Sequence, residues 1–239
     1  MIEQHRASTG RGVVVTGGGS GIGRAIAQAF VANGDRVVVL DRVATATDCV
    51  SVDVSQEDSV RAAFVTARQR LGTIDILVNS AGLLTESPMQ EMTLLMWNET
   101  VSVDLTGVFL CCREVVGEMR QQKWGRIINI ASQLAIKGGV GLSHYSAAKA
   151  GVVALTKSLA LEVASDNVLV NCIAPGPIDT PLVQGISEEW KAAKRDELPL
   201  GRFGTVEEVA PTAVLLASEP GGNLYVGQTL GPNSGDVMQ

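Results

Sequence analysis

The chain has 239 residues, a length that one α/β domain can occupy, and its 46% hydrophobic and 18% charged residues are typical of a folded globular protein. The net charge of -6 argues against a protein that binds nucleic acid by neutralising phosphates. The start is polar, and we see no apolar run long enough to cross a bilayer, so we expect a cytoplasmic protein that contacts neither nucleic acid nor membrane.

Short Val- and Ile-rich runs alternate with longer helical segments along the whole chain. The expected strands are 12–17, 36–40, 49–54, 74–82, 126–132, 168–176 and 225–230. The expected helices are 22–34, 55–72 (from a Ser55-x-x-Asp58 capping pattern), 95–122, 144–164, 188–197 and 206–217. Strands this continuously apolar are covered on both faces. The sequence therefore predicts a single α/β domain over 1–239, a Rossmann-like doubly wound sheet of about seven mostly parallel strands with helices on both faces.

A glycine-rich loop joins the first expected strand to the first expected helix. Glycines let a backbone turn sharply and approach a pyrophosphate, and a helix start presents free N–H groups to it. The alternative is a tight turn without a ligand, but a strand before the loop and a helix after it favour a dinucleotide. The residues expected to hold its phosphates are Gly17, Ser20, Gly21, Ile22 and Gly23.

An acidic residue, Asp41, ends the second expected strand, 18 residues after Gly23. The dinucleotide fingerprint has an acid near this spacing, where a carboxylate accepts hydrogen bonds from the adenosine ribose and repels a 2′-phosphate. This favours NAD over NADP. The neighbouring Arg42 could instead hold that phosphate, and Asp41 could simply be a solvated acid that caps the next turn.

These motifs resemble those of the short-chain dehydrogenase/reductase family in its non-extended form, from about Gly12 to Gly231. The family's T-G-x-x-x-G-x-G pattern matches Thr16, Gly17, Gly21 and Gly23. The resemblance implies Ser132, Tyr145 and Lys149 as the catalytic residues. It implies further cofactor contacts at Asp53, Val54, Asn79, Ala81, Gly82, Tyr145, Lys149, Pro175, Gly176, Ile178 and Thr180.

The chain departs from the family pattern at several places. Asp104 stands where the family usually has an Asn that helps to hold the water linking the catalytic Lys to solvent, so we add Asp104 to the catalytic set. The segment 231–235 replaces the family's Asp-Gly-Gly and is expected to reshape one edge of the pocket. Only residues 42–48 separate the second and third strands, which leaves no room for the family's usual extra helix.

Tyr145 and Lys149 lie four residues apart, so on a helix they share one face. We expect the ammonium and the positive nicotinamide ring to lower the pKa of the phenol, so that Tyr145 takes the alcohol proton in oxidation or donates it in reduction. The Ser132 hydroxyl would steady charge on the substrate oxygen. Taken singly, a Y-x-x-x-K pair more often lies on a solvated helix face, and a Ser at the end of a strand is more often a turn residue. Their coincidence with the glycine loop favours catalysis.

We therefore expect an NAD(H)-dependent oxidoreductase that interconverts a small secondary alcohol and a ketone, with Tyr145 as general acid/base. The first alternative is an NADPH-dependent reductase of 3-oxoacyl thioesters or other ketones, and the second is a non-catalytic dinucleotide sensor. No metal site is expected, because the four cysteines form no C-x-x-C pair. Lys137 is the charge close to Ser132 that could meet an anionic group. The family resemblance implies a homotetramer.

Overall fold

This computed structural model describes residues 10–43, 49–180, 183 and 188–238, without the side chain of Trp190. Its described strands form one seven-stranded sheet in the order β3-β2-β1-β4-β5-β6-β7, and every neighbouring pair is parallel. The strands are β1 Gly12–Thr16, β2 Arg36–Asp41, β3 Val50–Ser51, β4 Ile76–Asn79, β5 Gly125–Ile130, β6 Val168–Ile173 and β7 Thr229–Leu230. The predicted Rossmann-like α/β fold is confirmed.

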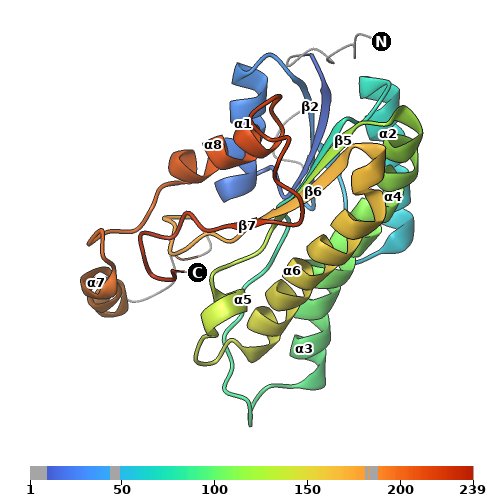
Figure 1. Ribbon diagram of the computed structural model, residues 1–239. Coiled ribbons are helices and arrows are strands. Elements are labelled where there is room, and N and C mark those ends of the chain that lie inside the picture. Colours follow the sequence, from blue (N-terminus) through green and yellow to red (C-terminus); the bar gives the residue numbers. More distant parts are fainter. Residues whose placement is uncertain (1–9, 44–48, 181–182, 184–187, 239) are drawn as a thin grey trace.

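Helices cover both faces of the sheet (Figure 1). The helices are α1 Gly21–Ala32, α2 Glu57–Leu71, α3 Leu94–Val101, α4 Gly107–Gln122, α5 Leu134–Lys137, α6 Ser143–Val163, α7 Glu188–Glu197 and α8 Val206–Leu216. Val13 and Val15 of β1 pack in the core with α1 and α8, whereas Val14 belongs to the core with α2, α4 and α6. Strands buried on both faces explain the continuous apolar runs in the sequence.

Several expected boundaries were wrong. The predicted strands 49–54, 74–82 and 225–230 shorten to β3, β4 and β7, because their flanking residues form loops. The predicted helix 95–122 is interrupted by a π-helical turn, Ser102–Thr106, between α3 and α4. The segment between the predicted strand 126–132 and the predicted helix 144–164 contains the short helix α5. The expectation of no helix before the third strand falls on 44–48, outside the described residues.

The predicted cap at Ser55 was also wrong. Helix α2 begins at Glu57 after Gln56, and no side-chain cap is formed. The Ser55 hydroxyl instead donates to Asp53 Oδ1 at 2.6 Å, and the same oxygen accepts from the Ser55 amide at 2.9 Å. Ser55 therefore takes part in a local turn around Asp53 and does not cap the helix, although the capping pattern had predicted that it would.

The parallel register brings the ends of the central strands together. Thr16 of β1 pairs with Asn79 of β4, Asn79 with Asn129 of β5, and Asn129 with Cys172 of β6. The loops that follow these residues consequently leave the sheet at one edge, where ligands bind in open α/β sheets. None of the described helices has the length and apolarity to span a membrane.

Candidate active site

The glycine loop is packed against the turn that follows β4. Gly17 has a φ of +66° and Gly21 a φ of +51°, backbone conformations that favour glycine. A Cβ at Gly17 would lie 2.6 Å from Ala81 Cα, and one at Gly23 would lie 2.3 Å from the Gly17 carbonyl oxygen. Both glycines are therefore required for the close contact of loop, helix and turn.

The start of α1 offers a site for an anion. The Ser20 side chain makes no capping hydrogen bond, and the Arg24 amide donates to the Ser20 carbonyl at 3.0 Å. The amides of Gly21, Ile22 and Gly23 precede that first bond, and such groups point out of a helix end. The cradle fits the pyrophosphate of a dinucleotide.

Thr16 is a residue whose role the sequence analysis missed. Its hydroxyl accepts hydrogen bonds from the amides of Ser80 and Ala81, each at 3.2 Å, and so fixes the 79–82 turn to β1. The Thr of the T-G motif was the available signal. Asn79, expected at the cofactor, points its amide into the protein interior, where it donates to Asn129 Oδ1 at 2.8 Å.

Asp41 lies directly beside the glycine loop. Its Oδ2 accepts from the Gly19 amide at 2.9 Å, and its Oδ1 accepts from the Val43 amide at 3.1 Å. The carboxylate thus joins the loop to the end of β2 and also caps the next turn, the role weighed as its alternative. Arg42 is exposed. An acid in this position opposes a 2′-phosphate on the adenosine ribose, which is the group that distinguishes NADP from NAD.

Asp53 and Val54 follow β3. Asp53 Oδ1 is engaged by Ser55, as described above, and the Asp53 amide donates to the Ser59 hydroxyl oxygen at 2.9 Å. Val54 is buried against α4, since a Cβ at Gly107 would lie 2.9 Å from Val54 Cγ2. The Val54 side chain therefore packs in the core and leaves its backbone for any contact with a cofactor.

The structure brings together the three expected catalytic residues. Ser132 follows β5, and its Oγ accepts from the Leu134 amide at 3.1 Å while lying within hydrogen-bonding reach of the Tyr145 phenol. Lys149 lies one turn beyond Tyr145 on α6, with its Nζ 5.6 Å from the centre of the tyrosine ring. That Nζ donates to the Ile130 carbonyl at 3.1 Å. All three side chains are buried.

In this structure burial outweighs the expected lowering of the Tyr145 pKa by Lys149. Burial raises the pKa of the phenol most strongly, and the charge of Asp104 raises it further. Lys149 and the hydrogen bond with Ser132 lower it, but the pKa still lies above its ordinary value. Spacing alone shows that Lys149 is near Tyr145, but it does not show how deeply the phenol is buried. The phenol is therefore held in its protonated form.

Asp104 lies in the π-helical turn and is fully buried. Its Oδ1 accepts from the Leu83 amide at 2.8 Å, and its Oδ2 lies 3.7 Å from Lys149 Nζ. Burial raises the pKa of Asp104, although Lys149 and Leu83 oppose this. Burial alone would lower the pKa of Lys149, but Asp104 and Tyr145 outweigh it, so that this pKa lies above its ordinary value.

The Pro175-Gly176 turn follows β6 and adjoins Ser132. The Gln133 amide donates to the Pro175 carbonyl at 3.0 Å, and the Gly176 amide donates to the Pro232 carbonyl at 3.1 Å. A Cβ at Gly176 would lie 2.6 Å from Asn233 Cα, so the segment 231–235 packs closely against this turn. Ile178 beyond the turn is buried, and the Thr180 carbonyl accepts from the Val183 amide at 3.0 Å.

Two buried cysteines near this site are unreactive. Burial raises the pKa of Cys112 and of Cys172 to about 12, which keeps both as thiols. Within the described ranges, no three His, Cys, Asp or Glu side chains are grouped so that they could hold a metal ion.

Comparisons with known proteins agree with this geometry. A family model described as enoyl-(acyl carrier protein) reductase matches residues 17–235. A 3-oxoacyl-[acyl-carrier-protein] reductase of Aquifex aeolicus is 39% identical over 88% of this chain and 91% of that protein. A cis-4-hydroxycyclohexanecarboxylate dehydrogenase of Sinomonas cyclohexanicum is 37% identical over 94% of this chain and 96% of its own length.

A crystal structure of gox2181 matches the fold with a TM-score of 0.91 at 32% identity, covering 95% of this chain and 96% of that one. The family resemblance found in the sequence motifs is therefore confirmed along nearly the whole chain. The chain belongs to the short-chain dehydrogenase/reductase family and is an oxidoreductase of that family.

Proposed function

We propose that this protein is a nicotinamide-dinucleotide-dependent ketone reductase that acts on 3-oxoacyl thioesters or closely related ketones. This was the alternative in the sequence analysis, and the similarity to 3-oxoacyl-[acyl-carrier-protein] reductases favours it over alcohol oxidation. The observation that carries the proposal is the position of the Tyr145 phenol, which is buried beside Ser132 and Lys149. A protonated phenol is the form that donates a proton to a nascent alkoxide.

Each catalytic side chain has one role in this proposal. Ser132 donates a hydrogen bond to the ketone oxygen and steadies its developing charge. Tyr145 donates the proton that completes the alcohol, and Lys149 stabilises the phenolate left behind. The cofactor, when bound, supplies the hydride. General acid catalysis of this kind contributes about 10²–10⁴-fold to the rate.

Asp104 is proposed as a positioning residue that acts through Lys149. Its carboxylate fixes the ammonium on one side while the Ile130 carbonyl fixes it on the other. Its negative charge also raises the pKa of Tyr145 and so favours the form needed for reduction. This role removes the main support for a non-catalytic sensor, which was the departure from Asn at this position.

The glycine loop, Asp41 and the sheet edge are proposed to bind NADH in preference to NADPH. Asp41 supports this preference because its carboxylate already lies against the Gly19 amide. The proposed cofactor contacts are Gly17, Ser20, Gly21, Ile22, Gly23, Asp41, Arg42, Asp53, Val54, Asn79, Ala81, Gly82, Tyr145, Lys149, Pro175, Gly176, Ile178 and Thr180. At Asn79 and Val54 we assign the contact to the backbone, since their side chains are engaged elsewhere.

A second candidate is the oxidation of a ring-borne secondary alcohol. It is favoured by the similarity to the cis-4-hydroxycyclohexanecarboxylate dehydrogenase over 94% of this chain. The same three residues would serve, with Tyr145 accepting the alcohol proton instead of donating one. A preference for NADH is compatible with this direction.

We further propose a cytoplasmic homotetramer. Phe109 of α4 and Leu161 of α6 are exposed large apolar side chains on helices that cover one face of the sheet. Burying such side chains between subunits is favourable. Light scattering after size exclusion measures the mass directly, and a monomer would contradict this assignment.

Titration of the purified protein with NADH and NADPH, followed by nicotinamide fluorescence, tests the proposal first. The loaded enzyme is then assayed with an acetoacetyl thioester and, in reverse, with a hydroxycyclohexane carboxylate. Faster thioester reduction is expected. Turnover of the ring alcohol alone would favour the second candidate, and binding of neither cofactor would contradict both.

A further inference from the structure

Asp236 lies in the segment that follows β7, referred to here as the tail, and its side chain is buried in contact with three donors. Its Oδ2 accepts from the Gln133 amide group and from Lys137 Nζ at 2.7 Å. Its Oδ1 accepts from Lys194 Nζ at 2.9 Å. Only 7% of the Asp236 side chain is exposed, and carboxylates are rarely this buried unless they are paired.

The three donors come from two segments that are far apart in the sequence. Gln133 directly follows Ser132, Lys137 ends α5, and Lys194 lies in the middle of α7. Helix α7 stands away from the helices that cover the sheet, and the tail runs between α7 and α5 (Figure 1). One carboxylate thus connects α7 to the segment that carries Ser132.

The tail also contacts the residues immediately after α7. The Leu200 amide donates to the Ser234 carbonyl at 3.3 Å, and a Cβ at Gly235 would lie 2.7 Å from Pro199 Cγ. These contacts fix the tail to the carboxyl end of α7 but do not reach α5. The connection across to α5 is made by Asp236.

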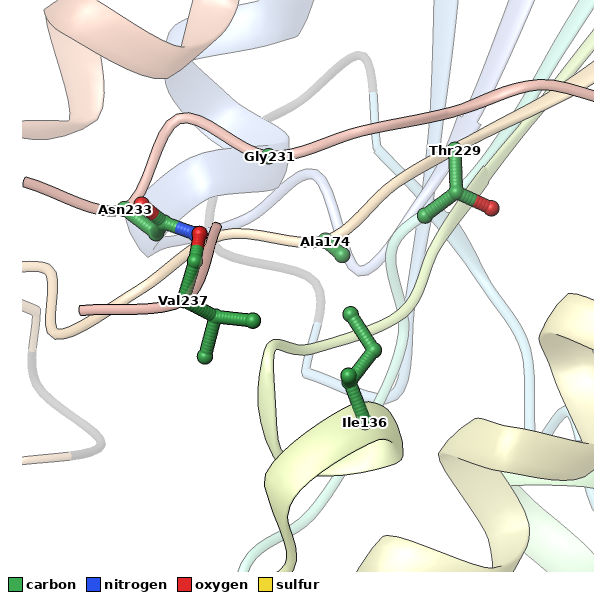
Figure 2. A pocket seen from close by; sticks show the side chains of 6 residues that line it. All are labelled: Ile136, Ala174, Thr229, Gly231, Asn233 and Val237. Atoms are coloured by element: carbon green, nitrogen blue, oxygen red, sulfur yellow. The ribbon is translucent and has the colours of Figure 1, made fainter. Parts of the chain in front are cut away.

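Apolar packing beneath the tail is incomplete. A cavity of about 140 Å³ lies between the tail, α5 and the ends of β6 and β7 (Figure 2). Its lining residues are Ile136, Ala174, Thr229, Gly231, Asn233 and Val237. Because side chains do not fill this space, the tail gains less from dispersion there, and the charged contacts carry more of its attachment.

The charges at this junction are balanced. Lys194 also donates to Glu197 Oε2 at 2.9 Å, so two lysines face two carboxylates. Burial would raise the pKa of Asp236, but Lys137, Lys194 and Gln133 outweigh it and hold the pKa below its ordinary value. The carboxylate therefore stays ionised at neutral pH and continues to accept from both lysines.

We propose that Asp236 is a positioning residue that latches α7 to the 132–137 segment and so fixes the position of α7 relative to Ser132. Residues 177–180 follow β6 at the edge of the sheet where ligands of α/β proteins bind, and α7 is the next helix along the chain. Elements that close over a site are fixed by few contacts, so that each contact has a large effect on their opening. The effect on turnover rests on the proposed function, whereas the effect on α7 does not.

The test uses Asp236→Asn in the full chain, which keeps the size of the side chain and removes its charge. Backbone amide exchange in 188–197 is expected to speed up by about 10-fold, the change that accompanies about 1.4 kcal/mol of lost local stability. KM for the ketone should rise by a similar factor, with kcat within about twofold and the Kd for NADH unchanged. Added salt should reproduce part of this effect in the parent protein and have less effect in the variant.

Glu188→Gln is the matched control. It removes a carboxylate from the same helix, where Glu188 pairs with Lys191 at 2.9 Å and not with the tail. We expect amide exchange in α7 and KM to stay at parent values. Lys194→Met should resemble Asp236→Asn, and the double variant should be no worse than either single one, because both break the same contact.

Unchanged exchange in α7 of folded Asp236→Asn protein would overturn the latch, as would an equal effect of Glu188→Gln. If Asp236→Asn does not fold, Lys194→Met gives the same comparison. Faster exchange in a protein that reduces no ketone would contradict the proposed function and support the latch. Normal turnover with unchanged exchange would contradict the latch alone.

Discussion

Asp104 Oδ2 lies 3.7 Å from Lys149 Nζ, and both side chains are buried behind Tyr145. The pair is built by a π-helical turn, which inserts Asp104 at the end of α3 so that its other oxygen reaches the Leu83 amide. Such turns interrupt helices at functional sites. A carboxyl group here stands next to the ammonium of Lys149 and within electrostatic range of the Tyr145 phenol.

Replacing this charge should change the pH dependence of the reaction. In Asp104→Asn the Leu83 amide keeps an acceptor, but the negative charge that raises the pKa of Tyr145 is gone. The pKa of Tyr145 should therefore fall. Since reduction needs the protonated phenol, its rate should begin to decline at a lower pH than in the parent, and alcohol oxidation should begin at a lower pH. Profiles of kcat/KM against pH measure both limbs.

The pH profile distinguishes positioning from a merely structural role. A structural defect would lower kcat at every pH and leave unchanged the pH values at which the profile rises and falls. Identical profiles for Asp104→Asn and the parent would mean that Asp104 does not influence the phenol. A shift of the reduction limb to higher pH would contradict the expected fall in the pKa of Tyr145.

Tyr145→Phe should abolish turnover and leave the dinucleotide in place. The phenyl ring still fills the buried space on α6, but no proton donor remains beside Ser132. We expect kcat to fall by about 10²–10⁴-fold, the contribution of one general acid, with the Kd for NADH within about twofold. Steady-state assays and fluorescence titration measure the two quantities. Turnover near the parent rate would rule out Tyr145 as the proton donor.

The fold and the grouping of Ser132, Tyr145 and Lys149 could be predicted from the sequence. Both follow from local sequence patterns together with the rule that parallel strands end at one edge of the sheet. Apolar runs indicated the strands, and the shared carboxyl edge of parallel strands brought Ser132 to Tyr145 and Lys149. The direction of the Tyr145 pKa was not predictable in this way, since burial depends on every segment that packs around the phenol.

Long-range contacts of single side chains were also beyond the sequence pattern. Lys137 was singled out as a charge that could meet an anion, and the anion it contacts is Asp236, 99 residues away. The π-helical turn was equally hidden, because the run 95–122 is helical by composition and nothing in its residues marks the extra residue in the turn.

Gly23→Ala tests the close packing of the glycine loop. The added methyl would meet the Gly17 carbonyl oxygen at 2.3 Å, so backbone must move at the anion cradle. Overpacking of this kind costs about 1–3 kcal/mol, and we expect the melting temperature to fall and NADH binding to weaken at least tenfold. Calorimetry and fluorescence titration report these separately. Parent-like NADH affinity would mean that the loop does not hold the cofactor.

Asp41→Asn tests which residue selects the cofactor. The amide oxygen can still accept from Gly19, but the charge that opposes a 2′-phosphate is removed, so the ratio of the Kd values for NADPH and NADH should fall by about 10-fold, or about 1.4 kcal/mol. Arg42→Gln is the companion variant, because Arg42 is exposed next to this position and would hold the phosphate in the opposing hypothesis. If Asp41 selects, Arg42→Gln changes the ratio little and Asp41→Asn changes it strongly. The reverse pattern would assign the choice to Arg42 and make NADPH the natural reductant, with the acid at 41 acting only to hold the glycine loop.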